Sequence, residues 1–331
     1  ASHAHWEKVE PSGLPRAFEQ LPAGGLAART RALLKIEDGC NSFCTYCIIP
    51  YARGRVRSMP LEAAVEETKR LAREGYREIV INGIEISSWG WEWKDGSRLP
   101  QLLLAVCEAA PDVRIRLGSL EPRTIDEEFC TMLSGCKNLC PQFHLSLQSG
   151  SDTVLKRMNR KYDTARYLES VRLLHEFFPN CAVTTDLIVG IIHMPLVRTL
   201  VGFPGETEQE FSDSLSFMQT CSLAAVHVFP YSRRSGTPAY DFPDQVHERE
   251  KQERSRTMNA LAEELRRDVL TTYEGMEDEV LLETALSETL FTGYTRLYVP
   301  VVVSVPGRKS GEIVRVRLGS YDGERVRAAL C

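Results

Sequence analysis

Three cysteines near the start of the chain have the spacing of metal ligands. Cys40, Cys44 and Cys47 lie in the segment CNSFCTYC, which follows the short apolar run 33–36. Three thiolates can bind three irons of a cubane [4Fe-4S] cluster and leave the fourth iron free to bind a small molecule. The spacing therefore predicts an iron–sulfur cluster with one open iron, and an open iron implies chemistry.

Two other uses of these thiols stay open at this point. A structural zinc site needs four ligands, usually two CxxC pairs, and only Cys44 and Cys47 form such a pair. Disulfides are the second alternative, but ten scattered cysteines in 331 residues, behind a start (ASHAHWEKVE) without a secretory apolar core, fit a reducing compartment better. A cluster is favoured over zinc and over incidental thiols.

Composition limits the classes of function. The chain has 43% apolar and 26% charged residues and a net charge of -5, which argues against a protein that coats nucleic acid. Any contact with RNA must then come from local patches. The longest nearly uncharged stretch, 187–197, is too short to span a bilayer. We therefore expect a cytoplasmic protein without a membrane partner, in two or three domains.

Six β-rich runs, most of them followed by a helix-like segment, must position the cysteine loop. This repeated βα pattern predicts an α/β fold, a partial parallel (β/α)6 barrel. Loops at the carboxyl ends of such strands converge on one mouth, so the cysteine loop and the short polar turns after the other strands should meet there. The six runs are 33–37, 78–82, 113–120, 143–147, 182–189 and 224–230.

The remainder of the chain changes pattern twice. A charged stretch with apolar residues at helical spacing, 246–270, predicts a bridging helix. Alternation of period two from about residue 279 predicts a small antiparallel β-barrel module, 271–331. Its latter part has an excess of arginine near Tyr294 and Tyr298, which suits an RNA backbone and unstacked bases, although a merely solvated strand face has the same pattern.

With these features together, the chain resembles the radical S-adenosylmethionine (SAM) methylthiotransferases, in particular those that act on threonylcarbamoyladenosine in tRNA. The resemblance rests on four segments and implies a radical SAM barrel over 33–245 and a terminal TRAM-like module over 271–331. The segments are 34–58, 144–162, 203–211 and 227–239.

The resemblance also implies how the site is used. Cys40, Cys44 and Cys47 would hold the cluster, with the amino and carboxylate groups of SAM on the open iron, and a deoxyadenosyl radical would form there, so no side chain is assigned as catalytic. Tyr46 would lie near the adenine of SAM. The other residues expected around SAM are Asn82, Gly83, Ser119, Glu121, Ser146, Gln148, Arg160, Phe229 and Tyr231.

The implied substrate is a tRNA that carries threonylcarbamoyladenosine beside its anticodon, with a one-electron reductant as second partner. A methylthio group would be added to C2 of the adenine. Two alternatives stay open: a sister enzyme that modifies an aspartate of a ribosomal protein, and a non-catalytic iron–sulfur RNA-binding protein. The basic residues expected to contact RNA are Arg53, Arg55, Arg57, Arg308, Lys309, Arg315 and Arg317.

The chain departs from the family pattern in two places. The family has an N-terminal domain whose three cysteines hold a second [4Fe-4S] cluster, whereas residues 1–32, expected to be a linker or remnant of that domain, contain no cysteine. Cys130, Cys136 and Cys140 are not expected to replace those ligands, so we expect SAM cleavage without sulfur delivery. The second departure is the apolar segment 191–199 after Gly190, where His193 is not assigned as a ligand.

Overall fold

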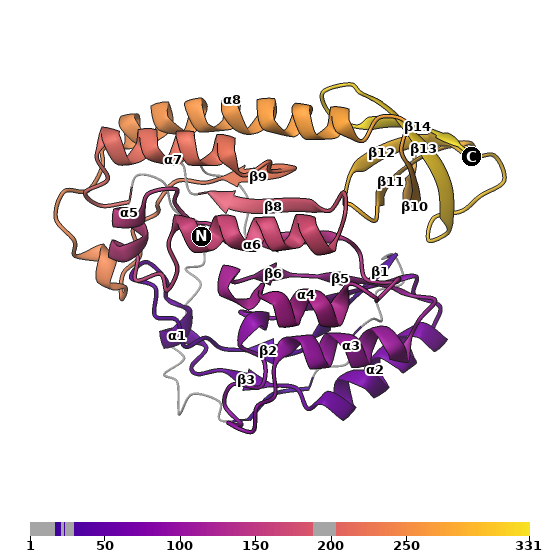
Figure 1. The fold of residues 1–331 in the computed structure, drawn as a ribbon, viewed down its shortest axis with the longest axis horizontal. Coiled ribbons are helices and arrows are strands. Elements are labelled where there is room, and N and C mark those ends of the chain that lie inside the picture. Colours follow the sequence, from indigo (N-terminus) through magenta and orange to yellow (C-terminus); the bar gives the residue numbers. More distant parts are fainter. Residues whose placement is uncertain (1–16, 21–22, 24–29, 188–202) are drawn as a thin grey trace, which may run out of the picture.

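The computed structural model describes residues 17–20, 23, 30–187 and 203–331 (Figure 1). The segment 191–199 and most of residues 1–32 lie outside these ranges. The described core is a curved sheet of parallel strands in two hydrogen-bonded parts, ordered β1-β4-β5 and β6-β7-β8-β9. A parallel bridge between Ile115 and Leu139 joins the parts where β5 runs into β6. The strands are β1 (Arg31–Lys35), β4 (Glu78–Asn82), β5 (Arg114–Leu117), β6 (Ser119–Leu120), β7 (Gln142–Leu145), β8 (Ala182–Leu187) and β9 (Ala225–Val228).

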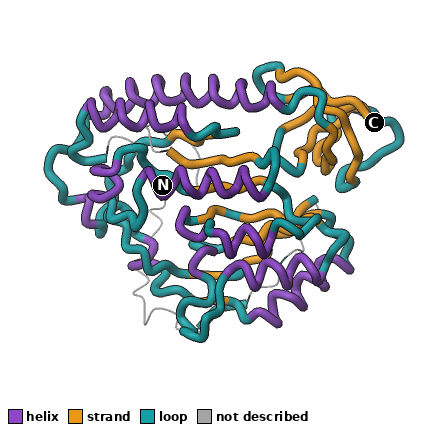
Figure 2. The backbone as a smooth tube through the Cα atoms, viewed as in Figure 1, coloured by secondary structure: helices purple, strands orange, loops and turns teal. Residues whose placement is uncertain are grey.

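Helices cover the outer face of this sheet, as Figures 1 and 2 show. Their buried faces follow from apolar residues at helical spacing, and their starts from local caps. The helix α7, for example, begins with a capping box in which Thr207 and Glu210 bond each other's backbone. The helices are α1 (Ile49–Ala52), α2 (Leu61–Arg73), α3 (Leu99–Ala109), α4 (Glu127–Leu133), α5 (Asp152–Arg157), α6 (Thr164–Phe177), α7 (Glu208–Thr220) and α8 (Glu248–Thr272), with the 3-10 turns η1 (Ile86–Ser88), η2 (Pro122–Thr124) and η3 (Pro238–Tyr240). The partial (β/α)6 barrel is confirmed.

The long helix α8 runs beside α7 and β9 and ends at the C-terminal module (Figure 1). It buries Met258 and Ala262 against the sheet domain and Leu270 against the C-terminal core. Glu264, Arg267 and Asp268, between these positions, are exposed, which accounts for part of the charge of the segment. None of the described helices is long and apolar enough to cross a lipid bilayer.

The C-terminal module is a closed five-stranded barrel, as predicted, with one parallel pair, β12 with β14, among antiparallel ones. Side chains alternate between core and solvent along β11 and β13, and Phe291, Val301 and Val316 are buried inside. Its strands are β10 (Glu277–Ala285), β11 (Leu290–Thr295), β12 (Pro300–Ser304), β13 (Ile313–Tyr321) and β14 (Val326–Leu330).

One buried arginine joins the two barrels. Arg116 of β5 bonds Glu78 at 2.8 Å and donates to the carbonyl oxygens of Thr295 (3.1 Å) and Arg296 (3.0 Å) in the β11–β12 turn. Tyr273 donates to the carbonyl oxygen of Cys181, directly before β8. The C-terminal module therefore sits at the amino ends of the parallel strands, opposite the cysteine loop.

Candidate active site

The cysteine loop begins at a glycine that no other residue can replace without strain. Gly39 has φ +88°, and a Cβ built on it would lie 2.1 Å from the carbonyl oxygen of Arg55. The short strands β2 (Glu37–Asp38) and β3 (Arg57–Ser58) pair on either side of the loop. Thr45 donates from its backbone N–H to Met158 and from its hydroxyl to Arg157, which ties the loop to α5.

All three thiols of the loop are free; Cys40 and Cys44 are buried and Cys47 is half-buried. Burial raises the pKa of Cys40 to about 11 and also raises that of Cys47. The guanidinium of Arg160 donates to Cys44 Sγ at 3.1 Å. This contact places a positive charge beside one of the sulfur atoms that would bind iron.

These residues fit a [4Fe-4S] cluster better than a zinc ion. Among the described residues, no group of three His, Cys, Asp or Glu side chains could hold a single metal ion. In a cubane each thiolate binds a different iron, so the sulfur atoms need not converge on one point. The soft sulfur donors on one loop and the cation beside them are what such a cluster needs.

Two residues predicted to contact SAM meet beside the cysteines. The hydroxyl of Tyr46 donates to Oε1 of Gln148 at 3.0 Å. Gln148 has φ 73°, an unfavourable backbone conformation for this residue type, and its N–H donates to the carbonyl oxygen of Asp186 at 3.1 Å. This backbone bond from the segment after β7 to β8 holds the Gln148 side chain against the cysteine loop.

Two carboxyl groups, that of buried Glu37 and that of half-buried Glu85, were missed by the sequence analysis. Glu37 accepts a hydrogen bond from the backbone N–H of Glu85 at 2.7 Å and lies against Gly83, where a Cβ would come 2.9 Å from the Glu37 carbonyl oxygen and 3.0 Å from Oε2. Burial raises the pKa of Glu37 to about 8 and that of Glu85 to about 7, while Arg160 opposes the shift at Glu85. Their signal in the sequence is an acid at the end of an apolar run, in KIED and NGIE.

The remaining residues expected around SAM divide into three groups. Asn82 and Ser119 are exposed at strand ends, and Ser146 is half-buried at the end of β7. Glu121 is buried and pairs with Arg123 at 2.9 Å. Tyr231 is buried against Phe203 (ring centroids 6.0 Å apart), with Lys251 of α8 over its ring.

The arginines expected to bind RNA also differ among themselves. Arg57 is buried, and its guanidinium donates to the carbonyl oxygens of Arg53 and Arg55, so it holds the loop and offers nothing to a phosphate. Arg53 and Arg55 are exposed. In the C-terminal module Arg315 and Arg317 both pair with Glu277, at 3.0 and 2.9 Å, and Arg308 pairs with Glu312. Lys309 is exposed beside them.

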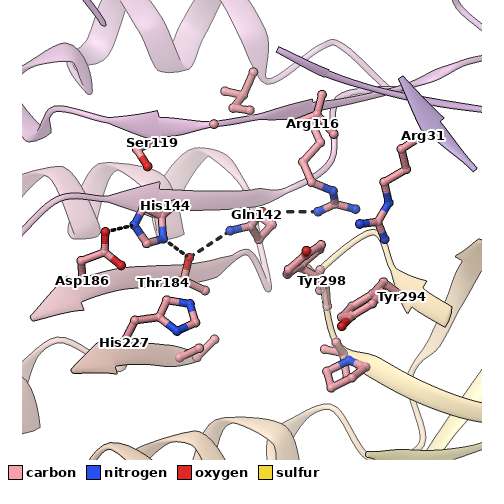
Figure 3. A pocket seen from close by; sticks show the side chains of 18 of the residues that line it. Arg31, Arg116, Ser119, Gln142, His144, Thr184, Asp186, His227, Tyr294 and Tyr298 are labelled. Atoms are coloured by element: carbon pink, nitrogen blue, oxygen red, sulfur yellow. Dashed lines mark hydrogen bonds and ion pairs between the residues drawn. The ribbon is translucent and has the colours of Figure 1, made fainter. Parts of the chain in front are cut away.

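A chamber of about 920 Å³ occupies the inside of the parallel sheet and reaches the C-terminal module (Figure 3). Phe229 lines it after β9, Ser119 lies level with His144 in the pairing of β6 with β7, and Arg31, Arg116 and Tyr298 line it at the amino ends. Part of its lining is apolar, with Leu33, Val80 and Leu117 among the residues. A row of hydrogen-bonding side chains from β7, β8 and β9 also lies on its wall: Gln142, His144, Thr184, Asp186 and His227.

Comparison with known proteins places this architecture. The radical SAM superfamily profile matches residues 34–218. Over 92% of the chain, 39% of residues are identical to the threonylcarbamoyladenosine tRNA methylthiotransferase MtaB of Bacillus subtilis, of which 65% is covered. The MtaB of Chlamydia pneumoniae is 35% identical over 93% of the chain and 69% of its own length. The tRNA-2-methylthio-N(6)-dimethylallyladenosine synthase of Bacillus subtilis is 37% identical over 91% of the chain and 58% of its own length.

Solved structures share the fold at low sequence identity. Coproporphyrinogen III oxidase (HemN) from Escherichia coli, a radical SAM enzyme, superposes with a TM-score of 0.51 and 13% identity, over 91% of this chain and 72% of that one. The radical SAM methyltransferase TsrM from Kitasatospora setae gives 0.50 and 18%, over 63% of this chain and 38% of that one.

The chain therefore belongs to the radical SAM superfamily and, within it, to the methylthiotransferase family. Its cofactors are accordingly a [4Fe-4S] cluster and SAM. The chain spans about 65% of the length of the MtaB of Bacillus subtilis and less of the dimethylallyladenosine synthases.

Proposed function

We propose that this chain is the radical SAM and TRAM-like part of a methylthiotransferase that adds a methylthio group to C2 of N6-threonylcarbamoyladenosine beside the tRNA anticodon. The observation that carries the proposal is the set of three free thiols on one loop, with the Arg160 guanidinium 3.1 Å from Cys44 Sγ. The identity to enzymes named for this reaction supports the choice of substrate.

The residues of the chain would divide the work as follows. Cys40, Cys44 and Cys47 would bind the cluster, which with SAM supplies the radical that removes hydrogen from C2 of the adenine. Tyr46, held by Gln148, would border the adenine of SAM. Glu85, which is half-buried beside Cys40, would accept a hydrogen bond from the amino group of SAM.

Contact with tRNA would use the exposed basic residues at both ends of the molecule. Arg53 and Arg55 lie past the cysteine loop, and Arg308, Lys309, Arg315 and Arg317 lie on the C-terminal module. Since Glu277 and Glu312 already pair with three of these arginines, phosphates must compete with carboxylates there. Binding of tRNA should weaken steeply with salt, and salt-insensitive binding would contradict a phosphate-binding role.

The proposed substrate also implies where in the cell the reaction takes place and that the family's second cluster takes part in it. A tRNA substrate and a one-electron reductant place the enzyme in the cytoplasm. The second [4Fe-4S] cluster of the family has no proposed ligands in this chain, since Cys130 and Cys140 are buried in the sheet domain and Cys136 lies beside Cys107.

The cluster assignment is tested by anaerobic iron and sulfide analysis and by formation of deoxyadenosine from SAM with a strong reductant. Wild type should bind about four irons per chain and cleave SAM, and Cys44→Ala should lose both properties. Cys130→Ala is the matched control, because it removes a buried thiol far from the loop and should keep both. If the wild type binds tRNA but cleaves no SAM, the result supports the alternative of a non-catalytic RNA-binding protein.

The substrate is tested by mass spectrometry of tRNA and ribosomal proteins from a strain that lacks the gene. Loss of the methylthio group from threonylcarbamoyladenosine alone supports the proposal. Loss from dimethylallyladenosine, or loss of a modification on a ribosomal aspartate, would assign the chain to one of the sister activities instead.

A further inference from the structure

Phe229, one of the residues expected to contact SAM, lines the chamber directly after β9. Asp186 and His227 are paired in the register of β8 and β9, one residue before the carboxyl ends of these strands, which form part of the mouth. A nucleobase presented to SAM at this mouth would direct one of its edges into the chamber. The groups that line the chamber then decide which substituents on the base can enter.

A row of hydrogen bonds crosses the wall of the chamber (Figure 3). The side-chain amide of Gln142 donates to Thr184 Oγ1 at 3.0 Å, and His144 Nδ1 lies 3.0 Å from the same oxygen. His144 Nε2 lies 3.2 Å from Oδ2 of Asp186. If the Thr184 hydroxyl donates to Nδ1, then Nε2 carries the proton and donates to Asp186. The row ends at a carboxylate on the chamber wall.

His227 faces the same space from β9 and keeps its hydrogen-bonding capacity. Its ring packs between those of His144 (centroids 6.1 Å apart) and Phe229 (6.4 Å). Among the described residues, neither its ring nitrogens nor Oδ1 of Asp186 has a hydrogen-bond partner. His227 is exposed to the chamber, and desolvation by the groups around the ring lowers its pKa, so at neutral pH the ring offers one donor and one acceptor. A polar ligand could satisfy both residues.

We propose that Asp186 and His227 bind the polar substituent on N6 of the target adenine and so select a threonylcarbamoyl group over a dimethylallyl group. This inference rests on the proposed function and names the residues that set its substrate class. The urea N–H groups of threonylcarbamoyl are donors for Asp186, and its carbonyl oxygen is an acceptor for the His227 N–H. A hydrocarbon substituent would leave both side chains desolvated and unpaired, which is the arrangement that discriminates most strongly between related ligands.

The overall similarity of the chain separates these two substrates by only a small difference in identity. The identity to the threonylcarbamoyladenosine enzyme of Bacillus subtilis is 39%, and that to its dimethylallyladenosine enzyme is 37%. The polar row in the chamber is what favours the first.

The experiment compares three anticodon stem–loop RNAs, which carry threonylcarbamoyladenosine, dimethylallyladenosine or unmodified adenosine, by fluorescence anisotropy with wild type, His227→Phe and Thr184→Val. Wild type should bind the first RNA most tightly. His227→Phe keeps the ring stacking and removes the polar atoms, so it should lose about tenfold in affinity for the first RNA and little for the other two. Thr184→Val removes the hydroxyl that bonds His144 Nδ1, so the difference in affinity between the first RNA and the other two should become smaller.

Tyr294→Phe is the matched control, because Tyr294 lines the other end of the chamber and should leave the preference unchanged. A thermal melt shows that each variant is folded. If wild type prefers the first RNA and both His227→Phe and Thr184→Val keep that preference, the inference fails and the proposed function stands. If wild type does not prefer the first RNA, both fail.

Discussion

Arg160 connects the cysteine loop with the parallel sheet. Its guanidinium contacts Cys44 Sγ on one side and donates to the Tyr162 hydroxyl at 3.1 Å on the other. Tyr162 in turn donates to the carbonyl oxygen of Leu147 at 2.9 Å, after β7. The cation is thus held from the sheet and does not depend on the cysteine loop for its position.

Arg160→Gln should lower the reduction potential of the reconstituted cluster, because an added electron is less stable without a nearby positive charge. A charge-assisted bond worth about 1.5 kcal/mol corresponds to a shift on the order of 50 mV, measured by redox titration followed by electron paramagnetic resonance. Arg172→Gln is the control, since that guanidinium pairs with Glu169 and Glu176 on the exposed face of α6. An unchanged potential at full iron content would contradict the role given to Arg160.

Two glycines with the same backbone conformation should respond differently to the same change. Gly39 (φ +88°) has a carbonyl oxygen 2.1 Å from the place of a Cβ, whereas Gly75 (φ +90°), after α2, has nothing within 4 Å. Gly75→Ala should cost about 1 kcal/mol of unfolding free energy from backbone strain alone. Gly39→Ala adds a clash and should cost about 3 kcal/mol or more. Equal costs in urea unfolding would show that the loop around Arg55 can move aside.

At the scale of elements, α5 and α7 are joined by a two-pronged ion pair. Arg157 donates to both oxygens of Glu210, at 2.7 and 2.8 Å, and this hydrogen bonding lowers the pKa of Glu210 from 4.5 to about 2. The pair holds α5 against α7. The carbonyl oxygens of Arg157 and Met158, at the end of α5, accept hydrogen bonds from Thr45 of the cysteine loop. The position of the loop thus depends on contacts far from it in the sequence.

Glu210→Gln should reduce stability in a pH-dependent way. The folded pKa lies below the unfolded one, so the pair stabilises fully above about pH 4.5 and its contribution is lost as the pH falls towards 2. After allowance for solvent screening, the difference from wild type should be on the order of 1 kcal/mol at pH 7 and should shrink steadily below pH 4.5. Urea unfolding at several pH values measures it, with Glu169→Gln in an exposed pair of α6 as a control that changes little.

At the scale of the whole molecule, a buried charge cluster joins the two barrels. Burial would raise the pKa of Glu78, but Arg116, Arg31 and Arg114 outweigh it and hold that pKa below its usual value. Tyr294 and Tyr298 stack on each other, 4.6 Å apart, and Arg31 lies over both rings. These tyrosines, expected on an RNA-binding face, therefore also close the lower end of the chamber.

Arg116→Met should loosen the C-terminal module as well as destabilise the protein. The change removes a partner of buried Glu78 and leaves two carbonyl oxygens of the β11–β12 turn without their donor, a loss of about 3 kcal/mol. Limited proteolysis should then cut near the end of α8 faster than in wild type. The double variant Arg116→Met with Glu78→Gln should recover part of the stability, because no unpaired carboxylate remains. Proteolysis at the wild-type rate would show that other contacts hold the module.

The sequence by itself determined the repeated βα pattern, the closed terminal barrel and the cysteine loop, because these depend on local periodicity and on ligand spacing within eight residues. It also named Tyr46 and Gln148, but their hydrogen bond forms only because two strand ends meet across a separation of 102 residues. The same analysis could not place Tyr231 in the core or make Arg57 a structural residue, since burial depends on what packs against a side chain.

Only the tertiary structure decided which polar side chains meet in the chamber and which arginines of the C-terminal module are paired with carboxylates. Asp186, His144 and His227 come from three strands, and Glu277 reaches Arg315 and Arg317 across the pairing of β10 with β13. Long-range pairing of this kind leaves no trace in local spacing. The chemistry of the cluster can thus be predicted from one short loop, whereas the choice of substrate depends on side chains that the fold brings together.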